Sequence, residues 1–168
     1  MARIVITDAS PLIGLARVDG LEWLRALFGE VWMPVEVRQE VLSGSRSLDE
    51  QDILNAERAG FLKVWPSLSP SMPDLPELDE GESACIRIGL SHKDSSLLLM
   101  DERAGRALAQ EKGLSVAGTA AVIGMARSRG LIPSAREVFS RLHDSDFRIS
   151  QAVIETVLRR VCEIDQGK

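Results

Sequence analysis

The sequence predicts an α/β fold: a three-layer α/β/α sandwich around a central, mostly parallel sheet of about five strands. Short apolar runs rich in valine, isoleucine and leucine alternate with longer segments of helical periodicity. The run Ile4-Val5-Ile6 is apolar on both faces, as in a parallel strand that helices cover on both sides. The chain has 168 residues, which fits one such domain over residues 1–168.

Local start and stop signals define the elements. Strands are expected at residues 3–7, 31–33, 61–65, 97–100 and 115–117. Helices are expected to begin at Ser10 and to cover residues 21–28, 34–42, 48–59, 78–90, 102–112, 119–129, 134–142 and 150–161. Ser10 and Pro11 predict an N-cap and the first helical position, and glycine follows several helices as a stop. The proline- and serine-rich residues 66–76 predict a surface loop, and the helical segment 134–161 is expected to pack on the sheet domain.

Composition narrows the classes of protein. Hydrophobic residues make up 45% and charged residues 27%, the balance of an ordinary globular protein. The N-terminal apolar run is too short for a signal peptide or a membrane span, which predicts a cytoplasmic protein without membrane contact. Cys85 and Cys162 lack a C-x-x-C spacing, so both are expected to be small buried residues. The net charge of −5 argues against a strongly basic nucleic-acid binder, although bound cations would restore positive charge at an acidic site.

Two of the predicted strands end in an aspartate. Asp8 closes the first apolar run and Asp101 closes the run at residues 97–100. In parallel α/β folds, ligands bind beyond the carboxyl ends of the strands. A single aspartate at a strand end is ordinary turn chemistry, but two at the same edge predict a functional site.

Glu82 is expected on the apolar stripe of its helix, where it shares a face with Cys85 and Ile86. The polar face of that helix is expected to carry Glu80, Ser83 and Arg87. A buried glutamate is unfavourable without an arginine or a metal ion to compensate its charge. Asp79 precedes it by one turn and either caps the helix or approaches the same centre.

Glu40 lies beside the buried stripe formed by Val37 and Val41, and by itself would be interpreted as a solvated helix edge. With Asp8, Glu82 and Asp101 it completes a set of carboxylates that would repel one another without a cation. Oxygen ligands suit Mg²⁺ or Mn²⁺, which activate water and offset phosphate charge. The set therefore predicts phosphodiester hydrolysis.

Taken in order, these motifs resemble a PIN domain, of a prokaryotic branch related to VapC-type toxins. The resemblance rests on the following stretches: Val5-Ile6-Thr7-Asp8-Ala9-Ser10-Pro11-Leu12-Ile13, Pro34-x-Glu36-Val37 through Glu40-Val41, Leu78-Asp79-x-Gly81-Glu82-Ser83, Leu99-Met100-Asp101-Glu102-x-x-Gly105-Arg106, Val116-x-Gly118-Thr119 and Phe147-Arg148-Ile149-Ser150. It spans nearly the whole chain. The third acid departs from the commonest toxin pattern, because it stands in Asp79-x-Gly81-Glu82 on a helix before the fourth strand.

The resemblance implies a Mg²⁺- or Mn²⁺-dependent endoribonuclease that cleaves single-stranded RNA. Asp8, Glu40, Glu82 and Asp101 take the catalytic and metal-binding positions, and Ser10 matches a hydroxyl that helps to order the site. It also implies the toxin of a type II toxin–antitoxin pair, a homodimer held inactive by a small cognate antitoxin. The alternative is a catalytically inactive PIN-like module that binds protein or RNA.

Three further residues are candidates for substrate contacts or for support of the acids. Arg103 and Arg106 lie three residues apart on one helix face, where they either clamp phosphates or pair with neighbouring glutamates. Thr119 begins a helix, where its hydroxyl and N–H either cap that helix or meet a phosphate.

Overall fold

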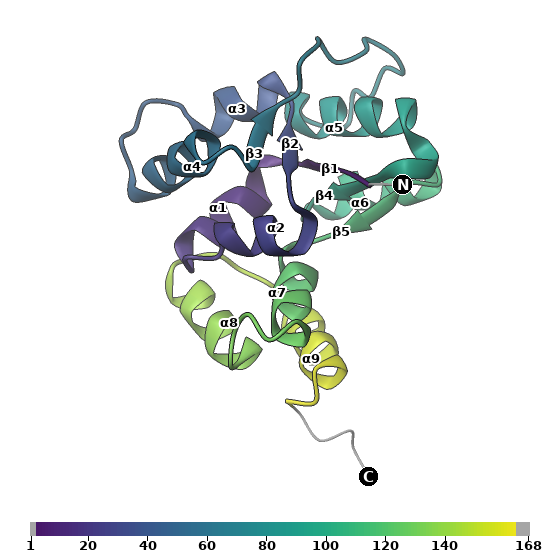
Figure 1. Cartoon of the computed structure of the whole chain (residues 1–168). Coiled ribbons are helices and arrows are strands. Elements are labelled where there is room, and N and C mark those ends of the chain that lie inside the picture. Colours follow the sequence, from purple (N-terminus) through teal and green to yellow (C-terminus); the bar gives the residue numbers. More distant parts are fainter. Residues whose placement is uncertain (1–2, 164–168) are drawn as a thin grey trace.

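A computed structural model describes residues 3–163 and confirms the three-layer α/β/α architecture (Figure 1). The described strands form one sheet of five, all parallel, in the order β3-β2-β1-β4-β5. Their bounds are β1 Ile4–Thr7, β2 Val31–Met33, β3 Leu62–Val64, β4 Ser96–Leu99 and β5 Ser115–Ala117. β1 is the central strand, and β4, far along the chain, is its neighbour.

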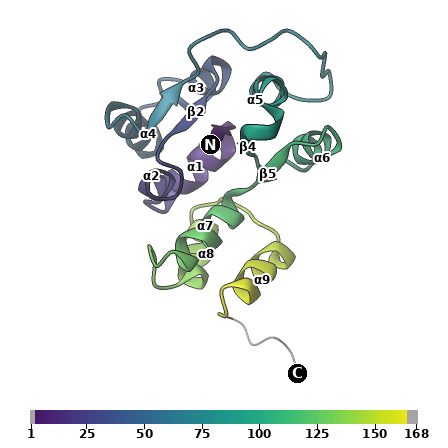
Figure 2. The same ribbon diagram turned by 45° about the vertical axis from the view of Figure 1, so that its right-hand side comes forward.

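Helices cover both faces of this sheet. Their bounds are α1 Ala9–Arg17, α2 Leu21–Phe28, α3 Val35–Val41, α4 Leu48–Arg58, α5 Glu80–Ser91, α6 Arg103–Glu111, α7 Thr119–Ser128, α8 Ala135–Asp144 and α9 Gln151–Arg160, with a short 3-10 turn at Lys93–Ser95. Figure 2 shows α1 and α2 on one side of the strands and α5 and α6 on the other. α3 packs against both α1 and α5.

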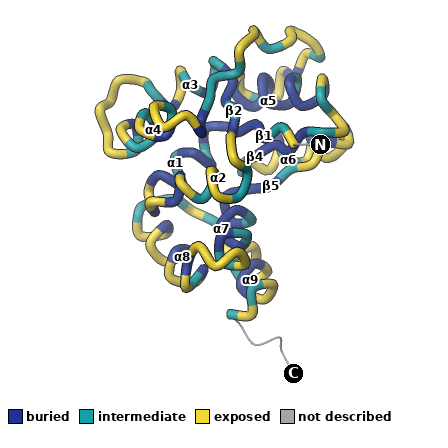
Figure 3. The backbone as a smooth tube through the Cα atoms, viewed as in Figure 1, coloured by how far each residue is buried: buried dark blue, intermediate teal, exposed yellow. Residues whose placement is uncertain are grey.

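The core lies between these layers. Every residue of β4 is buried, and Val5 and Ile6 of β1 are at most 2% exposed, as expected for parallel strands covered on both faces (Figure 3). At the carboxyl end, α8 and α9 pack on α7, which contacts α1 and α2. The segment 65–79 has no helix or strand and runs over the surface above α3 and α5 (Figure 1). Among residues 3–163, no helix is both long enough and apolar enough to span a membrane.

Two predicted N-caps were wrong. α1 begins at Ala9, so Asp8, with extended backbone directly after β1, takes the N-cap position that Ser10 was expected to hold. Pro11 still lies in the first turn, where no backbone donor is needed. The N-cap of α7 is Gly118, and Thr119 is already helical.

Two burial predictions were also wrong. Ser83 is buried, because α5 packs against α3, α6 and β4, whereas Glu80 in the same turn is exposed. Cys162 is exposed, since it lies beyond the end of α9 in a left-handed turn. Cys85, by contrast, is buried as predicted.

Candidate metal centre at the carboxyl edge of the sheet

The pairing of β1 with β4 brings Asp8 and Asp101 to one edge. Thr7 is in register with Leu99, and the Asp8 N–H donates to the Leu99 carbonyl at 2.9 Å. Asp101 follows β4 after one intervening residue, Met100, whose N–H donates to the carbonyl of Ala117 in β5 at 2.9 Å. Adjacent parallel strands therefore place both aspartates where ligands of such folds bind.

Asp8 is an unsatisfied buried acid. It is 3% exposed, its side chain makes no capping bond to α1, and Oδ1 is the one buried side-chain polar atom among residues 3–163 without a hydrogen-bond partner. Burial, and then the nearby Asp79, Glu40 and Asp101 carboxylates, raise the pKa of Asp8 to about 7, against the adjacent Ala9 N–H, which lowers it. Such an orphaned acid is unfavourable unless a proton or a cation accompanies it.

α5 brings two further acids over Asp8. The Asp79 carboxylate caps this helix by accepting a hydrogen bond from the Glu82 N–H at 2.8 Å, so the capping interpretation of Asp79 is correct. Glu82 is 7% exposed. Burial, a side-chain hydrogen bond with Asp79 and the charges of Asp79, Asp8 and Glu102 raise the pKa of Glu82 to about 8. Asp79 therefore both caps α5 and belongs to the acidic group.

Glycines make the close approach of these acids feasible. A Cβ on Gly81 would lie 3.1 Å from Asp8 Oδ1 and 3.4 Å from Glu40 Oε2, and a Cβ on Gly105 of α6 would lie 2.9 Å from Glu82 Oε2. Glu40 itself is exposed at the end of α3, but desolvation of its carboxyl group and the neighbouring Asp79 charge raise its pKa. We name Asp8, Glu40, Asp79, Glu82 and Asp101 the acidic edge.

Asp101 is held differently from the other acids. Its Oδ1 accepts from the Thr119 N–H and its Oδ2 from the Thr119 hydroxyl, both at 2.7 Å. Thr119 is fully buried, so this pair of bonds orients the Asp101 carboxylate from the first turn of α7. The two residues are 18 positions apart in the sequence; Thr119 was a candidate for support of the acids, but no local pattern indicated Asp101 as its partner.

The acidic edge fits a hard divalent cation in its donor chemistry. It offers carboxylate oxygens, one of them an orphaned buried atom, and mutual repulsion that a cation would relieve. Within the described part of the chain, however, no group of three or more histidine, cysteine, aspartate or glutamate side chains is arranged so that it could hold a metal ion. The acids thus lie within electrostatic range of one another without surrounding one point at ligand distances.

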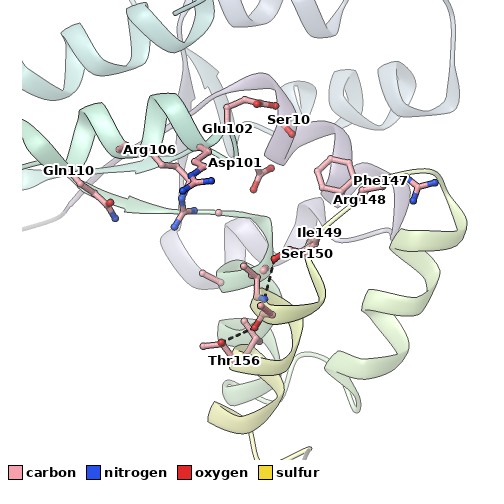
Figure 4. A pocket seen from close by; sticks show the side chains of 18 of the residues that line it. Ser10, Asp101, Glu102, Arg106, Gln110, Phe147, Arg148, Ile149, Ser150 and Thr156 are labelled. Atoms are coloured by element: carbon pink, nitrogen blue, oxygen red, sulfur yellow. Dashed lines mark hydrogen bonds between the residues drawn. The ribbon is translucent and has the colours of Figure 1, made fainter.

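A groove adjoins the acidic edge at Asp101. It has a volume of about 1070 Å³ and lies between α6 and α9, and its lining includes Ser10, Asp101, Arg106, Phe147, Ser150 and Arg160. Figure 4 shows the Asp101 carboxylate facing this space, with Ser10 beside it. We name it the α6–α9 groove. The stretch Phe147-Arg148-Ile149-Ser150 belongs to the family resemblance, but no sequence pattern places residues 146–160 against α6, because only tertiary packing brings them there.

The parallel sheet with acids at its carboxyl edge defines a protein of the PIN class. The chain belongs to the DUF3368 family, a PIN domain, whose family model matches residues 4–163. No curated protein and no solved structure shows significant similarity to it. PIN domains are generally nucleases and typically use divalent metal ions, so this chain has a nuclease fold.

Proposed function

We propose that the protein is a metal-dependent endoribonuclease that cleaves phosphodiester bonds of single-stranded RNA with Mg²⁺ or Mn²⁺. The observation that carries the proposal is Asp8, whose buried and unpartnered Oδ1 stands among acids that help raise its pKa to about 7. A buried carboxylate without a hydrogen-bond partner does not stabilise the fold. In a cation-binding nuclease the same carboxylate is useful, because the cation offsets the charge that makes its burial unfavourable.

Each acid has a role that follows from its position. When bound, the cation supplies an activated water and offsets charge on the phosphate. Asp8 and Asp101 would hold it from the two strand ends, with Glu82 from α5 and Glu40 from α3 completing the ligands. Thr119 keeps the Asp101 carboxylate oriented. Asp79 shares a hydrogen bond with Glu82 and thereby favours a proton on the Glu82 carboxyl group when the cation is absent.

The resemblance to VapC-type proteins carries the proposal further. On this basis we propose that the chain is the toxin of a type II toxin–antitoxin pair, and that it is cytoplasmic, homodimeric and inhibited by a small cognate antitoxin. Co-expression tests this role: the chain alone should arrest growth, and the small protein encoded beside it should relieve the arrest and co-purify with it. Arrest that persists with the neighbouring protein bound would contradict the antitoxin assignment.

A second candidate function is a catalytically inactive module that binds protein or RNA. One observation favours it: among residues 3–163, no three potential ligands are arranged so that they could hold a metal ion. An inactive module would not depend on the charge of Asp8, so the two candidates differ in what replacement of that carboxylate does.

Cleavage of a single-stranded RNA with Mn²⁺ or Mg²⁺, and its arrest by EDTA, tests the proposal directly. Asp8→Asn and Asp101→Asn should each lower the cleavage rate by more than about a hundredfold, because each removes a charged ligand of the cation. Asp94→Asn is the matched control, since Asp94 is exposed in the 3-10 turn before β4. Circular dichroism should show all three variants folded.

Two outcomes separate the candidates. Equal cleavage by Asp8→Asn, Asp101→Asn and the parent would overturn the metal-site assignment. A parent that neither cuts RNA nor binds Mn²⁺ by calorimetry would leave the inactive module as the function of the fold.

A further inference from the structure

The geometry points to the α6–α9 groove as the path of the substrate strand beside the acidic edge, with Arg106 as the residue that positions a phosphate next to Asp101. This inference rests on the proposed nuclease function and deepens it, because it names how the strand is held. The groove would bind the sugar–phosphate backbone through arginine side chains contributed by α6, by the segment before α9 and by α9.

Arg106 and Asp101 approach one another across Gly118. A Cβ on Gly118 would lie 2.6 Å from Arg106 Nη1 and 2.8 Å from Asp101 Oδ1, so glycine leaves open the space between the two charged groups. No ion pair joins them within the described residues. The Arg106 side chain makes one hydrogen bond, from Nη1 to the Met100 carbonyl at 3.2 Å, which leaves most of its five N–H donors available. A fixed guanidinium beside a cation-binding carboxylate is suited to bidentate contact with phosphate.

The other arginines of the groove are also unpaired. Arg103 and Arg106 project from α6, Arg148 lies in the segment before α9, and Arg160 ends α9. In residues 3–163 none of the four forms an ion pair. Ion pairs are formed instead by arginines elsewhere: Arg17, Arg25, Arg38, Arg127 and Arg141. In a chain of net charge −5, four arginines without an ion pair among residues 3–163 thus line one groove, although arginines without an ion pair there, such as Arg58 and Arg159, also lie elsewhere.

The lining of the groove also contains three acids. Asp101 and Glu102 lie beside Ser10, and Asp146 precedes Phe147 (Figure 4). Arg106 lies beside Asp101 in this view, whereas Arg148 lies farther away, beyond Phe147. The four arginines outnumber the three acids, and one of these acids belongs to the proposed cation site.

The shape and lining of the groove favour an extended RNA strand that is bound without sequence preference. The volume of about 1070 Å³ is at the upper end of pockets for single small molecules. The one aromatic residue in its lining, Phe147, packs its ring on Gly14, where a Cβ would meet it at 2.8 Å. Base stacking on an aromatic platform is therefore absent from the described lining, and phosphate charge has to supply the affinity.

The test is binding of a fluorescein-labelled single-stranded RNA, measured by anisotropy in EDTA so that cleavage plays no part. Arg106→Ala should weaken binding about tenfold. The plot of log affinity against log salt should become shallower by about 0.7 for each phosphate that the variant no longer neutralises. Arg159→Ala is the matched control, because Arg159 is exposed on α9 next to Arg160 but does not line the groove. It should bind as the parent does.

Arg106→Lys separates positioning from folding and from charge. Lysine keeps the charge but lacks the planar fork, so Kd should stay within about threefold of the parent while kcat with Mn²⁺ falls about tenfold. A merely structural role of Arg106 would change the melting temperature and leave the salt dependence unchanged.

The outcomes distinguish this inference from the proposed function. If the parent cleaves RNA but Arg106→Ala and Arg159→Ala bind it equally well, the groove assignment is overturned and the nuclease stands. If RNA binds with the predicted arginine dependence but the parent never cleaves it, the nuclease proposal fails alone. An acidic peptide such as poly-glutamate that binds while RNA does not would overturn the inference in favour of a protein partner.

Discussion

Glu50 and Glu82 are two buried glutamates of equal exposure with opposite environments. Each is 7% exposed. The Glu50 carboxylate accepts hydrogen bonds from the N–H groups of residues 44–46 and from the Ser43 hydroxyl, at 2.8 to 3.2 Å. Desolvation by burial acts to raise the pKa of Glu50, but these bonds together outweigh it and lower that pKa. Glu82 has carboxylates around it in place of donors, and its pKa rises to about 8.

The difference shows how a structural acid can be told from a functional one. Glu50 closes the turn between α3 and α4, and its charge is satisfied by the backbone it organises. Glu82 and Asp8 organise no loop and gain nothing from their charge in the cation-free protein. Burial alone therefore does not identify a site; burial without donors does.

The largest expected effect that can break this comparison is the pH dependence of stability without metal. The folded-state pKa of Asp8 is about 7 against an ordinary value of 3.8, so the folded state binds the proton more tightly than the unfolded state. The contribution of Asp8 to stability should fall as pH rises from about 4 to about 7, by as much as roughly 4 kcal/mol, and the raised pKa of Glu82 extends the fall to about pH 8. In the Asp8→Asn variant, the melting temperature should decrease less as the pH rises.

Mn²⁺ is the control for that experiment. It should raise the melting temperature of the parent at pH 8 and have little effect at pH 5, where protons already occupy Asp8 and Glu82. Two outcomes would contradict the acidic-edge assignment. One is a melting temperature of the parent that does not change with pH. The other is an increase in melting temperature with Mn²⁺ that is as large in Asp8→Asn as in the parent.

An intermediate effect comes from the same substitution at the two glutamates. Glu82→Gln should raise the melting temperature by a few degrees at pH 8 without metal, because it removes one charge from a repulsive group. Glu50→Gln should lower it, because the new amide cannot accept the bonds that one carboxylate oxygen receives. The Glu50→Gln loss should disappear as the pH falls through the folded-state pKa of Glu50, which lies below its ordinary value of 4.5. Differential scanning calorimetry measures both melting temperatures. Shifts of the same sign in Glu82→Gln and Glu50→Gln would contradict the distinction between a structural and a functional glutamate.

The smallest expected effect concerns Thr119, which orients the Asp101 carboxylate. Thr119→Val keeps the shape and the backbone bond but removes the hydroxyl bond to Asp101 Oδ2, which should cost about 1 kcal/mol. Mn²⁺ affinity, measured by calorimetry, should fall about tenfold, as for other groups that orient a metal ligand. Thr156→Val is the matched control, since the Thr156 hydroxyl bonds only within α9. If both variants bind Mn²⁺ alike, Thr119 serves the fold and not the site.

Local pattern was enough to predict much of this molecule. The strand ends place Asp8 and Asp101, and helical periodicity predicts the burial of Glu82 beside Cys85 and Ile86. Where prediction failed, as at Ser10 and Ser83, the helix start or the enclosure of a helix face was decided by neighbouring elements. Glu40 was chosen by resemblance, because an exposed glutamate on a helix edge carries no local signal.

By itself the sequence determined the elements, the parallel sheet and the identity of the acids, since each depends on residues within a few positions of one another. Only the tertiary structure decided which of these residues meet. The strand order puts β4 beside β1, so that Asp101 lies near Asp8 and α5 crosses over both. The bond from Thr119 to Asp101, the glycines that admit the carboxylates and the second wall of the α6–α9 groove join distant segments. They arise from packing, for which the sequence has no short-range signal.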